Sequence, residues 1–321
     1  MKDILQYKLP NENTVKLNGS FKSCSDFNEI DGFFLSDFKK DKLYCFVEGD
    51  TEDVYSSQEN LPVAISMQEY LAQGELFLSS FEKCGVDKAI FSRVKLEEQS
   101  VDSNELFESL CGLYPKAFVY LIRSKMFGTW IGATPEVLLR REDTYSETMS
   151  LAGTKPMDDD SPWSFKERQE QNYVTEFIDQ ILKESNVSSL MKSEVNTVLA
   201  GPVKHLITEF QFQLNYEDTL TIASKLHPTP AVSGLPRAAA LKLIDSHELH
   251  DRELYAGMIG IHSKEVSDIF VNLRCAQVFE NHIALYLGGG YTMDSIVEKE
   301  WQETESKALT LLDPISQLKN R

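Results

Sequence analysis

Short apolar segments that follow one another closely along the chain constrain its fold more than any other feature. Strands are predicted at residues 88–94, 118–122, 129–133 and 136–140, and a hairpin at residues 269–278 and 283–287. Connections this short leave no room for the crossover that parallel neighbours require, so the strands should pair antiparallel. Helices are predicted at residues 162–184, 234–246 and 296–312, without a regular strand–helix alternation. This mixture predicts an α+β fold built on antiparallel sheets.

Composition limits the classes of partner. Of the 321 residues, 42% are hydrophobic, which is enough for an ordinary globular core. Acidic residues number 50 and basic residues 32, and the net charge of −18 argues against nucleic acid or an anionic membrane as a partner. No repeat or linker divides the sequence, so we expect one domain over residues 1–321, acting as a monomer.

The N-terminus and the cysteines bear on the cellular compartment. Residues 1–8 lack the apolar core of a signal peptide, and no apolar run approaches the roughly 18 residues that span a membrane. The five cysteines are odd in number and form no CxxC pair, which is typical of reduced thiols. We therefore expect a cytoplasmic protein with reduced cysteines and no membrane partner.

Charged residues near the C-terminus are spaced to share one helical face. Glu300, Glu303 and Lys307 stand at i, i+3 and i+7, which brings them together on a helix. Before them come the bare backbone of residues 288–290, all glycine, and Arg274 within an apolar strand. Such a group could bind a divalent metal and a small anion together. The ordinary alternative is a set of exposed helix acids paired with neighbouring lysines.

Other charged residues are predicted to point inward. Glu170 extends the apolar stripe of the helix at 162–184, where an unpaired carboxylate would be costly. Lys88 shares a strand face with Ile90 and could act there as a base, and Glu136 begins a strand. Each also has an ordinary interpretation: an acid of the first helical turn, a strand-end lysine that reaches water, and an edge-strand acid.

Segments that carry these residues occur in an order known from one enzyme family. Among them are Lys88-Ala-Ile-Phe-Ser-Arg93, His227-Pro-Thr-Pro-Ala-Val-Ser-Gly234 and Asp251-Arg-Glu-Leu-Tyr-Ala-Gly257. The others are residues 132–136, 151–154, 166–170, 273–276, 288–290 and 300–307. Together they resemble the chorismate-utilising enzymes, the anthranilate synthase component I-like family, and most closely its isochorismate synthases. The resemblance covers residues 88–312 and implies a large αββα sandwich, to which residues 1–87 should also belong.

The resemblance implies a role for each matched position. Lys88 would be the general base that activates water, and Glu136 the general acid that protonates the departing hydroxyl. Glu170 and Glu303 would bind Mg²⁺, with Glu300 beside it. The substrate, chorismate, would be bound by residues of the surrounding segments, namely Gly153, Thr154, His205, Ala231, Tyr255, Arg274, Gly288, Gly290 and Lys307.

The implied activity is the reversible, Mg²⁺-dependent conversion of chorismate to isochorismate, an isomerase reaction. Water would add at C2 and the C4 hydroxyl would leave. The product could serve either menaquinone or siderophore biosynthesis, and the sequence does not choose between them.

Departures from the family pattern keep other functions open. Gln171 stands where relatives often have histidine, and Tyr255 where siderophore-pathway isochorismate synthases tend to have phenylalanine. A salicylate synthase, which goes on to eliminate pyruvate, is one alternative, although Ala231 replaces its usual threonine. A catalytically silent protein that holds a chorismate-like anion is an alternative of another class.

Overall fold

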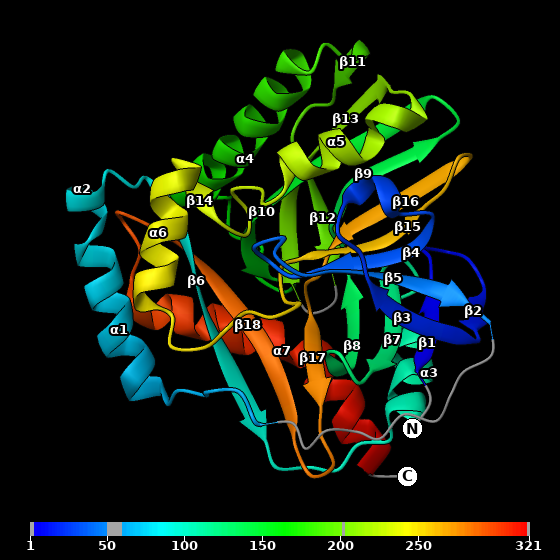
Figure 1. Cartoon of the computed structure of the whole chain (residues 1–321). Helices are drawn as coiled ribbons and strands as arrows, with labels where there is room; N and C mark the ends of the chain where they lie inside the picture. Colours follow the sequence, from blue (N-terminus) through cyan, green and yellow to red (C-terminus); the bar gives the residue numbers. More distant parts are fainter. Residues whose placement is uncertain (1–2, 50–59, 201–202, 320–321) are drawn as a thin grey trace.

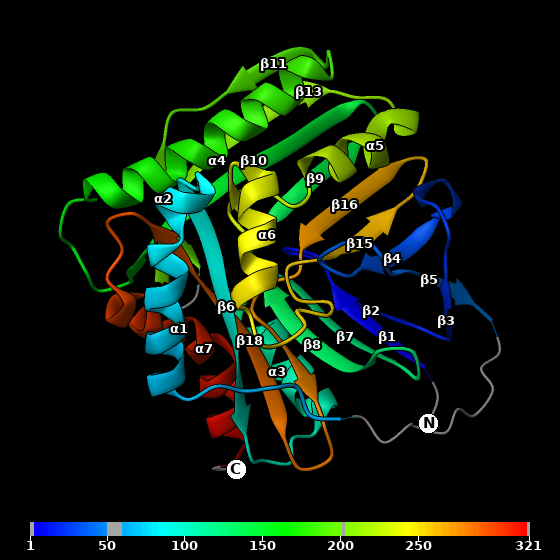
Figure 2. The same ribbon diagram turned by 60° about the vertical axis from the view of Figure 1, so that its left-hand side comes forward.

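Two large antiparallel sheets lie face to face in the middle of the molecule (Figures 1 and 2). The computed structural model describes residues 3–49, 60–200 and 203–319. One sheet has eight strands, in the spatial order β14 (Gly234–Leu235), β6 (Lys88–Glu97), β18 (Ile283–Thr292), β17 (Cys275–Val278), β8 (Gly128–Thr134), β7 (Phe118–Ser124), β1 (Ile4–Lys8) and β2 (Thr14–Leu17). The other has ten, in the order β11 (Ser188–Lys192), β13 (Val203–Gln213), β10 (Tyr145–Pro156), β9 (Val137–Glu142), β16 (Val266–Val271), β15 (Met258–His262), β4 (Gly32–Ser36), β5 (Leu43–Glu48) and β3 (Gly19–Ser23), with β12 (Asn196–Ala200) also paired to β13.

Helices cover the outer face of each sheet. α3 (Ser103–Leu113) and α7 (Val297–Lys319) pack through Leu110 and Leu311 on the eight-stranded sheet. α4 (Phe165–Glu184) and α5 (Tyr216–Leu226) cover the ten-stranded sheet. The layers therefore run helix, sheet, sheet, helix, which confirms the predicted αββα sandwich with antiparallel sheets.

A third group of helices closes the side of the eight-stranded sheet. α1 (Met67–Ser79), α2 (Phe81–Cys84) and α6 (Arg237–His247) lie near β6, and α1 and α6 flank it in Figure 2. Phe77, Phe91 and Leu243 belong to the apolar cluster that joins them. Within the ranges that the structure describes, the remaining helix is the short η1 (Phe27–Glu29). Among the residues that the structure describes, no helix is long and apolar enough to cross a membrane.

The predicted strands exist, but one of them is divided between the two sheets. Residues 269–278 were expected to form one arm of a hairpin with Arg274 inside it. Instead β16 ends at Val271 in the ten-stranded sheet, and β17 begins at Cys275 in the eight-stranded sheet. Arg274 lies in the connection with a φ of 49°. Only the second half, β17, pairs with β18 as predicted.

Local interactions set helix starts that differ from the predicted ones. α4 begins at Phe165 rather than at residue 162, because Ser164 and Glu167 form a capping box there. α6 begins at Arg237 rather than at residue 234, because Gly234 and Leu235 pair with Ala89 and Lys88 of β6. α7 begins at Val297 and continues past residue 312 to Lys319.

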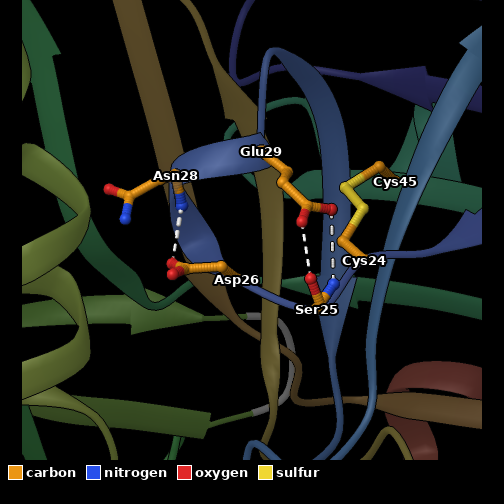
Figure 3. The surroundings of a disulfide bond; sticks show 6 residues. All are labelled: Cys24, Ser25, Asp26, Asn28, Glu29 and Cys45. Carbon is orange, nitrogen blue, oxygen red and sulfur yellow. Dashed lines mark hydrogen bonds between the residues drawn. A yellow bond between two sulfur atoms is a disulfide. The ribbon is translucent and has the colours of Figure 1, made fainter.

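The expectation of reduced cysteines is wrong for one pair. Cys24 and Cys45 form a disulfide, shown in Figure 3 beside the turn in which Glu29 accepts a hydrogen bond from Ser25. Cys24 follows β3, whose antiparallel partner β5 contains Cys45, so the sheet brings the two thiols together. Sequence spacing cannot reveal such a pair, because the cysteines are 21 residues apart. Cys84, Cys111 and Cys275 are free thiols.

We expect Gly234→Ala to lower the free energy of unfolding by more than about 1 kcal/mol. Gly234 has a φ of 135°, and a Cβ there would lie 2.1 Å from the carbonyl oxygen of Lys88. Urea denaturation measures the effect. Gly112→Ala is the matched control, since Gly112 lies in α3 with open space around it and should gain stability from the better helix former. Equal stabilities of the two variants would contradict the prediction.

Candidate active site

A buried lysine faces a carboxylate at the start of β6. Lys88 is 0% exposed, and its Nζ lies 3.0 Å from Oε1 of Glu170 in α4. The distance is that of an ion pair between an ammonium and a carboxylate. The interpretation of Lys88 as a strand end that reaches water is therefore wrong, and Glu170 points inward as predicted.

Two more lysine–carboxylate pairs lie on α7. Lys307 Nζ is 2.6 Å from Oε1 of Glu303 and donates a hydrogen bond to the Gly288 carbonyl at 2.8 Å. Lys166 of α4 donates to Oε1 of Glu300, a side chain that is 1% exposed. Glu300 is thus no exposed helix acid, and its lysine partner comes from another helix. Carboxylates from α4 and α7 meet at the end of β18.

Glycine in β18 permits this meeting. A Cβ at Gly290 would lie 2.4 Å from Oε1 of Glu170, and one at Gly288 would lie 2.7 Å from the Tyr255 hydroxyl oxygen. Any larger residue would push these side chains away from the strand. Gly288 and Gly290 therefore allow the side chains of Tyr255 and Glu170 to approach the strand closely.

The carboxylates differ in their electrostatic surroundings. Burial, and then the charge of Glu303, raises the pKa of Glu300 to about 7, although Lys166 opposes the shift. Burial also disfavours the ionised form of Glu170, but the charges of Lys88 and Lys166 outweigh it and lower its pKa. Oε2 of Glu300 is buried and accepts no hydrogen bond. Such an oxygen beside two further carboxylates is a donor set that suits a hard cation such as Mg²⁺.

The glutamate oxygens are chemically suited to bind a cation, but their present positions do not form a metal site. Within the described residues, no three acidic, histidine or cysteine side chains already stand at metal-ligand spacing. Lysine ammonium groups occupy the carboxylates instead. Gln171, next to Glu170, turns away and donates from Nε2 to Oγ of Ser150 in β10 at 2.9 Å, so it ties α4 to the sheet.

Arg274, His205, Gly153 and Thr154 form a second, cationic part of the site. Arg274 donates to Nε2 of His205 at 3.3 Å, and His205 Nδ1 lies 3.1 Å from the Gly153 carbonyl. The Nδ1 proton therefore belongs to the Gly153 bond, and Nε2 is left as an acceptor. Burial, followed by the charges of Arg274 and Lys307, lowers the pKa of His205 to about 3, which keeps the ring neutral.

A bulge in β10 brings this group together. The register between β10 and β13 shifts between Ala152 and Thr154, where Gly153 has a φ of 69°. Thr154 then stands opposite His205, and its Oγ1 lies 3.2 Å from Nδ1 of that ring.

Glu136 is a buried carboxyl with an unusual affinity for its proton. It lies just before β9 and is 4% exposed. Burial raises its pKa to about 7, although the charges of Lys88, Arg274 and Lys307 oppose the shift. Near neutral pH, Glu136 can therefore hold a proton that an exposed glutamate would have lost.

These side chains surround one small cavity of about 60 Å³. Most of the residues predicted from the sequence line it: Glu136, Thr154, Glu170, His205, Ala231, Tyr255, Arg274, Gly288, Gly290 and Lys307. Lys88, Gly153 and Glu303 stand behind this wall, in contact with Glu170, His205 and Lys307 respectively. Glu300 does not line the cavity either, and it forms an ion pair with Lys166 of α4.

Some residues of the site were missed by the sequence analysis. Lys166 lies four residues before Glu170 on the same helical face, and this spacing could have revealed it. Leu273, Tyr286 and Leu287 also line the cavity. Ordinary apolar strand patterns contain such residues everywhere, so no signal in the sequence distinguishes them.

Sequence comparisons agree with this geometry. The family model described as "Chorismate binding enzyme" matches residues 48–316. The isochorismate synthase EntC of Escherichia coli is 32% identical over 242 residues, which cover 71% of this chain and 62% of EntC. The isochorismate synthase MenF of Escherichia coli is 35% identical over 192 residues, which cover 57% of this chain and 44% of MenF. The matches thus span about three-fifths or less of these relatives' length.

Solved structures share the whole fold. A Bacillus anthracis protein described as a 2,3-dihydroxybenzoate-specific isochorismate synthase, DhbC, superposes with a TM-score of 0.83 at 23% identity, covering 98% of this chain and 96% of the other. Anthranilate synthase component I of Streptococcus pneumoniae superposes with a TM-score of 0.70 at 18% identity, covering 97% and 90%. The fold and the matched segments agree, and the chain belongs to the family of chorismate-binding enzymes.

Proposed function

We propose that the protein is an isochorismate synthase, which converts chorismate to isochorismate. The observation that carries the proposal is a cavity lined by Glu136, whose pKa is raised to about 7, and by Glu170, which pairs with the fully buried Lys88. Similarity to EntC and MenF, both isochorismate synthases, supports the same reaction. The match to anthranilate synthase structures concerns the fold alone.

The reaction requires a base and an acid. Lys88 would take a proton from water while the water oxygen forms a bond to C2 of chorismate, and for this its amine must first be released from the ion pair with Glu170. The ring double bonds shift, the C4–oxygen bond breaks, and Glu136 would give its proton to the departing hydroxyl, which leaves as water. Glu136 suits the second task because its burial keeps the carboxyl protonated near pH 7.

Carboxylate groups of the substrate need cationic partners. The guanidinium of Arg274 presents a planar set of donors suited to a carboxylate, and Lys307 adds a second positive charge at the cavity wall. Both side chains are half-buried, a setting in which charge pairing is stronger than in water. His205 is neutral and offers no competing charge, but it holds the guanidinium in place.

Glu170, Glu300 and Glu303 are the residues that would hold Mg²⁺. When bound, the metal would supply positive charge that offsets and orients a substrate carboxylate. The three lysines that pair with these carboxylates, Lys88, Lys166 and Lys307, would then have to give up part of those contacts.

A salicylate synthase is the second candidate, because one observation favours it. The Tyr255 hydroxyl reaches the cavity wall beside Gly288, so a hydroxyl is available to hold isochorismate for pyruvate elimination. Ala231, which also lines the cavity, has no hydroxyl to offer. We give Ala231 the greater weight and propose that isochorismate is released.

Product analysis tests the proposal directly. Incubation with chorismate and Mg²⁺ should give a mixture of chorismate and isochorismate by chromatography, with little pyruvate in a coupled lactate dehydrogenase assay. A parallel incubation in EDTA should show little conversion, because the glutamate set would lack its metal. Stoichiometric pyruvate would establish the salicylate synthase instead, and no turnover of chorismate at all would leave only an anion-binding protein.

Lys88→Gln should lower kcat by about 10²–10⁴-fold, the usual cost of losing a general base. Steady-state kinetics with chorismate measures the loss, and circular dichroism shows whether the variant is folded. Lys95→Gln is the matched control, since Lys95 lies on the same strand but is partly exposed and pairs with Glu305. A folded Lys88→Gln protein with the kcat of the control would show that the base lies elsewhere.

The rate should fall as the pH rises through about 7. Glu136 acts in its protonated form, and its raised pKa means that the protonated fraction is high below pH 7 and is lost above it. The pH dependence of kcat/KM reports this group. Glu136→Gln should be slow at every pH and lack this limb, and an unchanged limb in that variant would assign it to another residue.

A further inference from the structure

The connection between β16 and β17 joins the two sheets at the cavity. The N–H of Val271 donates to the Glu136 carbonyl at 3.0 Å, and the carbonyl of Arg274 accepts from Ala133 at 3.1 Å. The connection thus touches both sides of the segment that carries Glu136. Arg274 is the last residue of the connection, and the chain passes from one sheet to the other through its left-handed φ of 49°.

Asn272, inside this connection, forms hydrogen bonds with both ends of its side-chain amide. It is 1% exposed, its Oδ1 accepts from the Tyr120 hydroxyl at 2.6 Å, and its Nδ2 donates to the Leu254 carbonyl at 2.8 Å. Its backbone accepts from Ala256 at 2.7 Å and donates to Gly257 at 2.8 Å. The two side-chain bonds fix which end of the amide is oxygen, because a hydroxyl can donate and a carbonyl can only accept.

Three of these four bonds hold one turn, residues 254–257. The turn contains Tyr255, whose ring lines the cavity, and Ala256, which has a φ of 60°. A left-handed alanine is unfavourable and persists only where its surroundings determine it. Within the turn, Gly257 donates to Leu254 at 3.1 Å. The Asn272 amide therefore anchors a strained turn through the Leu254 carbonyl.

The geometry points to Asn272 as a positioning residue that fixes the Tyr255 side chain relative to Arg274 in the substrate cavity. It touches neither the cavity nor the reacting atoms, since it is absent from the lining residues. Asn272 acts on Tyr255 through its hydrogen bond to the carbonyl of the preceding residue, Leu254. It acts on Arg274 through the backbone, since Arg274 lies two residues further along the chain. The inference rests on the proposed function for its kinetic readout only.

The alternative is that Asn272 only stabilises the fold. A buried amide with satisfied bonds stabilises the fold wherever it lies, and losing one partner of such a bond costs about 1–3 kcal/mol. A stabilising role would lower the melting temperature but leave kcat/KM of the folded enzyme unchanged. A positioning role also changes kcat/KM, and does so only while the Tyr255 side chain is present.

A double-mutant cycle separates the two roles. In the intact enzyme, Asn272→Leu should lower kcat/KM by about 10²-fold, the cost of a misplaced contact in an active site. In a Tyr255→Ala background the same change should cost much less, because the group it positions is gone. In a Lys307→Met background, Asn272→Leu should lower kcat/KM by the same factor as in the intact enzyme, because Asn272 does not contact Lys307. Equal factors in all three backgrounds would overturn the inference.

Tyr120→Phe provides a milder variant in case Asn272→Leu does not fold. It removes the hydroxyl that orients the Asn272 amide and that also contacts the Cys275 thiol, and the same cycle with Tyr255→Ala applies. Tyr114→Phe is its matched control, since the Tyr114 hydroxyl also donates to a single acceptor, the Thr310 carbonyl, at 3.1 Å. Equal losses of kcat/KM in these two variants would count against the inference.

Hydrogen exchange separates a failure of this inference from a failure of the proposed function. Without any substrate, the amides of Tyr255 and Gly257 should exchange faster in the Asn272 or Tyr120 variant than in wild type. Absence of chorismate turnover by the wild type would refute the proposed function and leave this measurement intact. Unchanged exchange would refute the anchoring by Asn272, whatever reaction the wild type performs.

Discussion

The ion pair between Lys88 and Glu170 is the interaction on which the rest of the site depends. Neither charge could be buried alone, because an isolated ion in a protein interior costs several kcal/mol. Removing one partner from such a pair typically costs about 3–5 kcal/mol, since the other charge is left uncompensated. The pair joins the first residue of β6 to α4 across the two layers of the sandwich. A shift of the start of β6 relative to α4 would therefore separate the two charged groups.

The same pairing explains why carboxylates from different layers can meet. α4 lies on the ten-stranded sheet and α7 on the eight-stranded sheet, yet Lys166 of α4 contacts Glu300 of α7. Glu300 lies in the first turn of α7, where the partial positive charge of the helix N-terminus favours an anion, and Glu303 and Glu170 each lie in the second turn of their helices. Lysines and helix termini together make a cluster of three acids tolerable before any metal binds.

Part of this arrangement could be predicted from sequence because it depends on local patterns. Helical spacing placed Glu300, Glu303 and Lys307 together, and the glycines at 288–290 were recognised as bare backbone of the same group. The division of residues 269–278 between two sheets could not be predicted, because an apolar run looks the same on either side of a sheet change. The disulfide of Cys24 and the strands before residue 50 likewise depend on pairing between distant segments.

The structure also separates the two carboxyls that line the cavity by their protonation. Glu170 has Lys88 at 3.0 Å and Lys166 nearby, and these charges keep it ionised. Glu136 is more deeply buried, and the cations around it only reduce the effect of burial, so its pKa rises to about 7. Two glutamates pushed apart in this way are suited to different tasks, one to bind a cation and one to give a proton. That division follows from which strand or helix carries each residue. Glu170 faces Lys88 across the layers, whereas Glu136 is held from behind by the connection that contains Asn272.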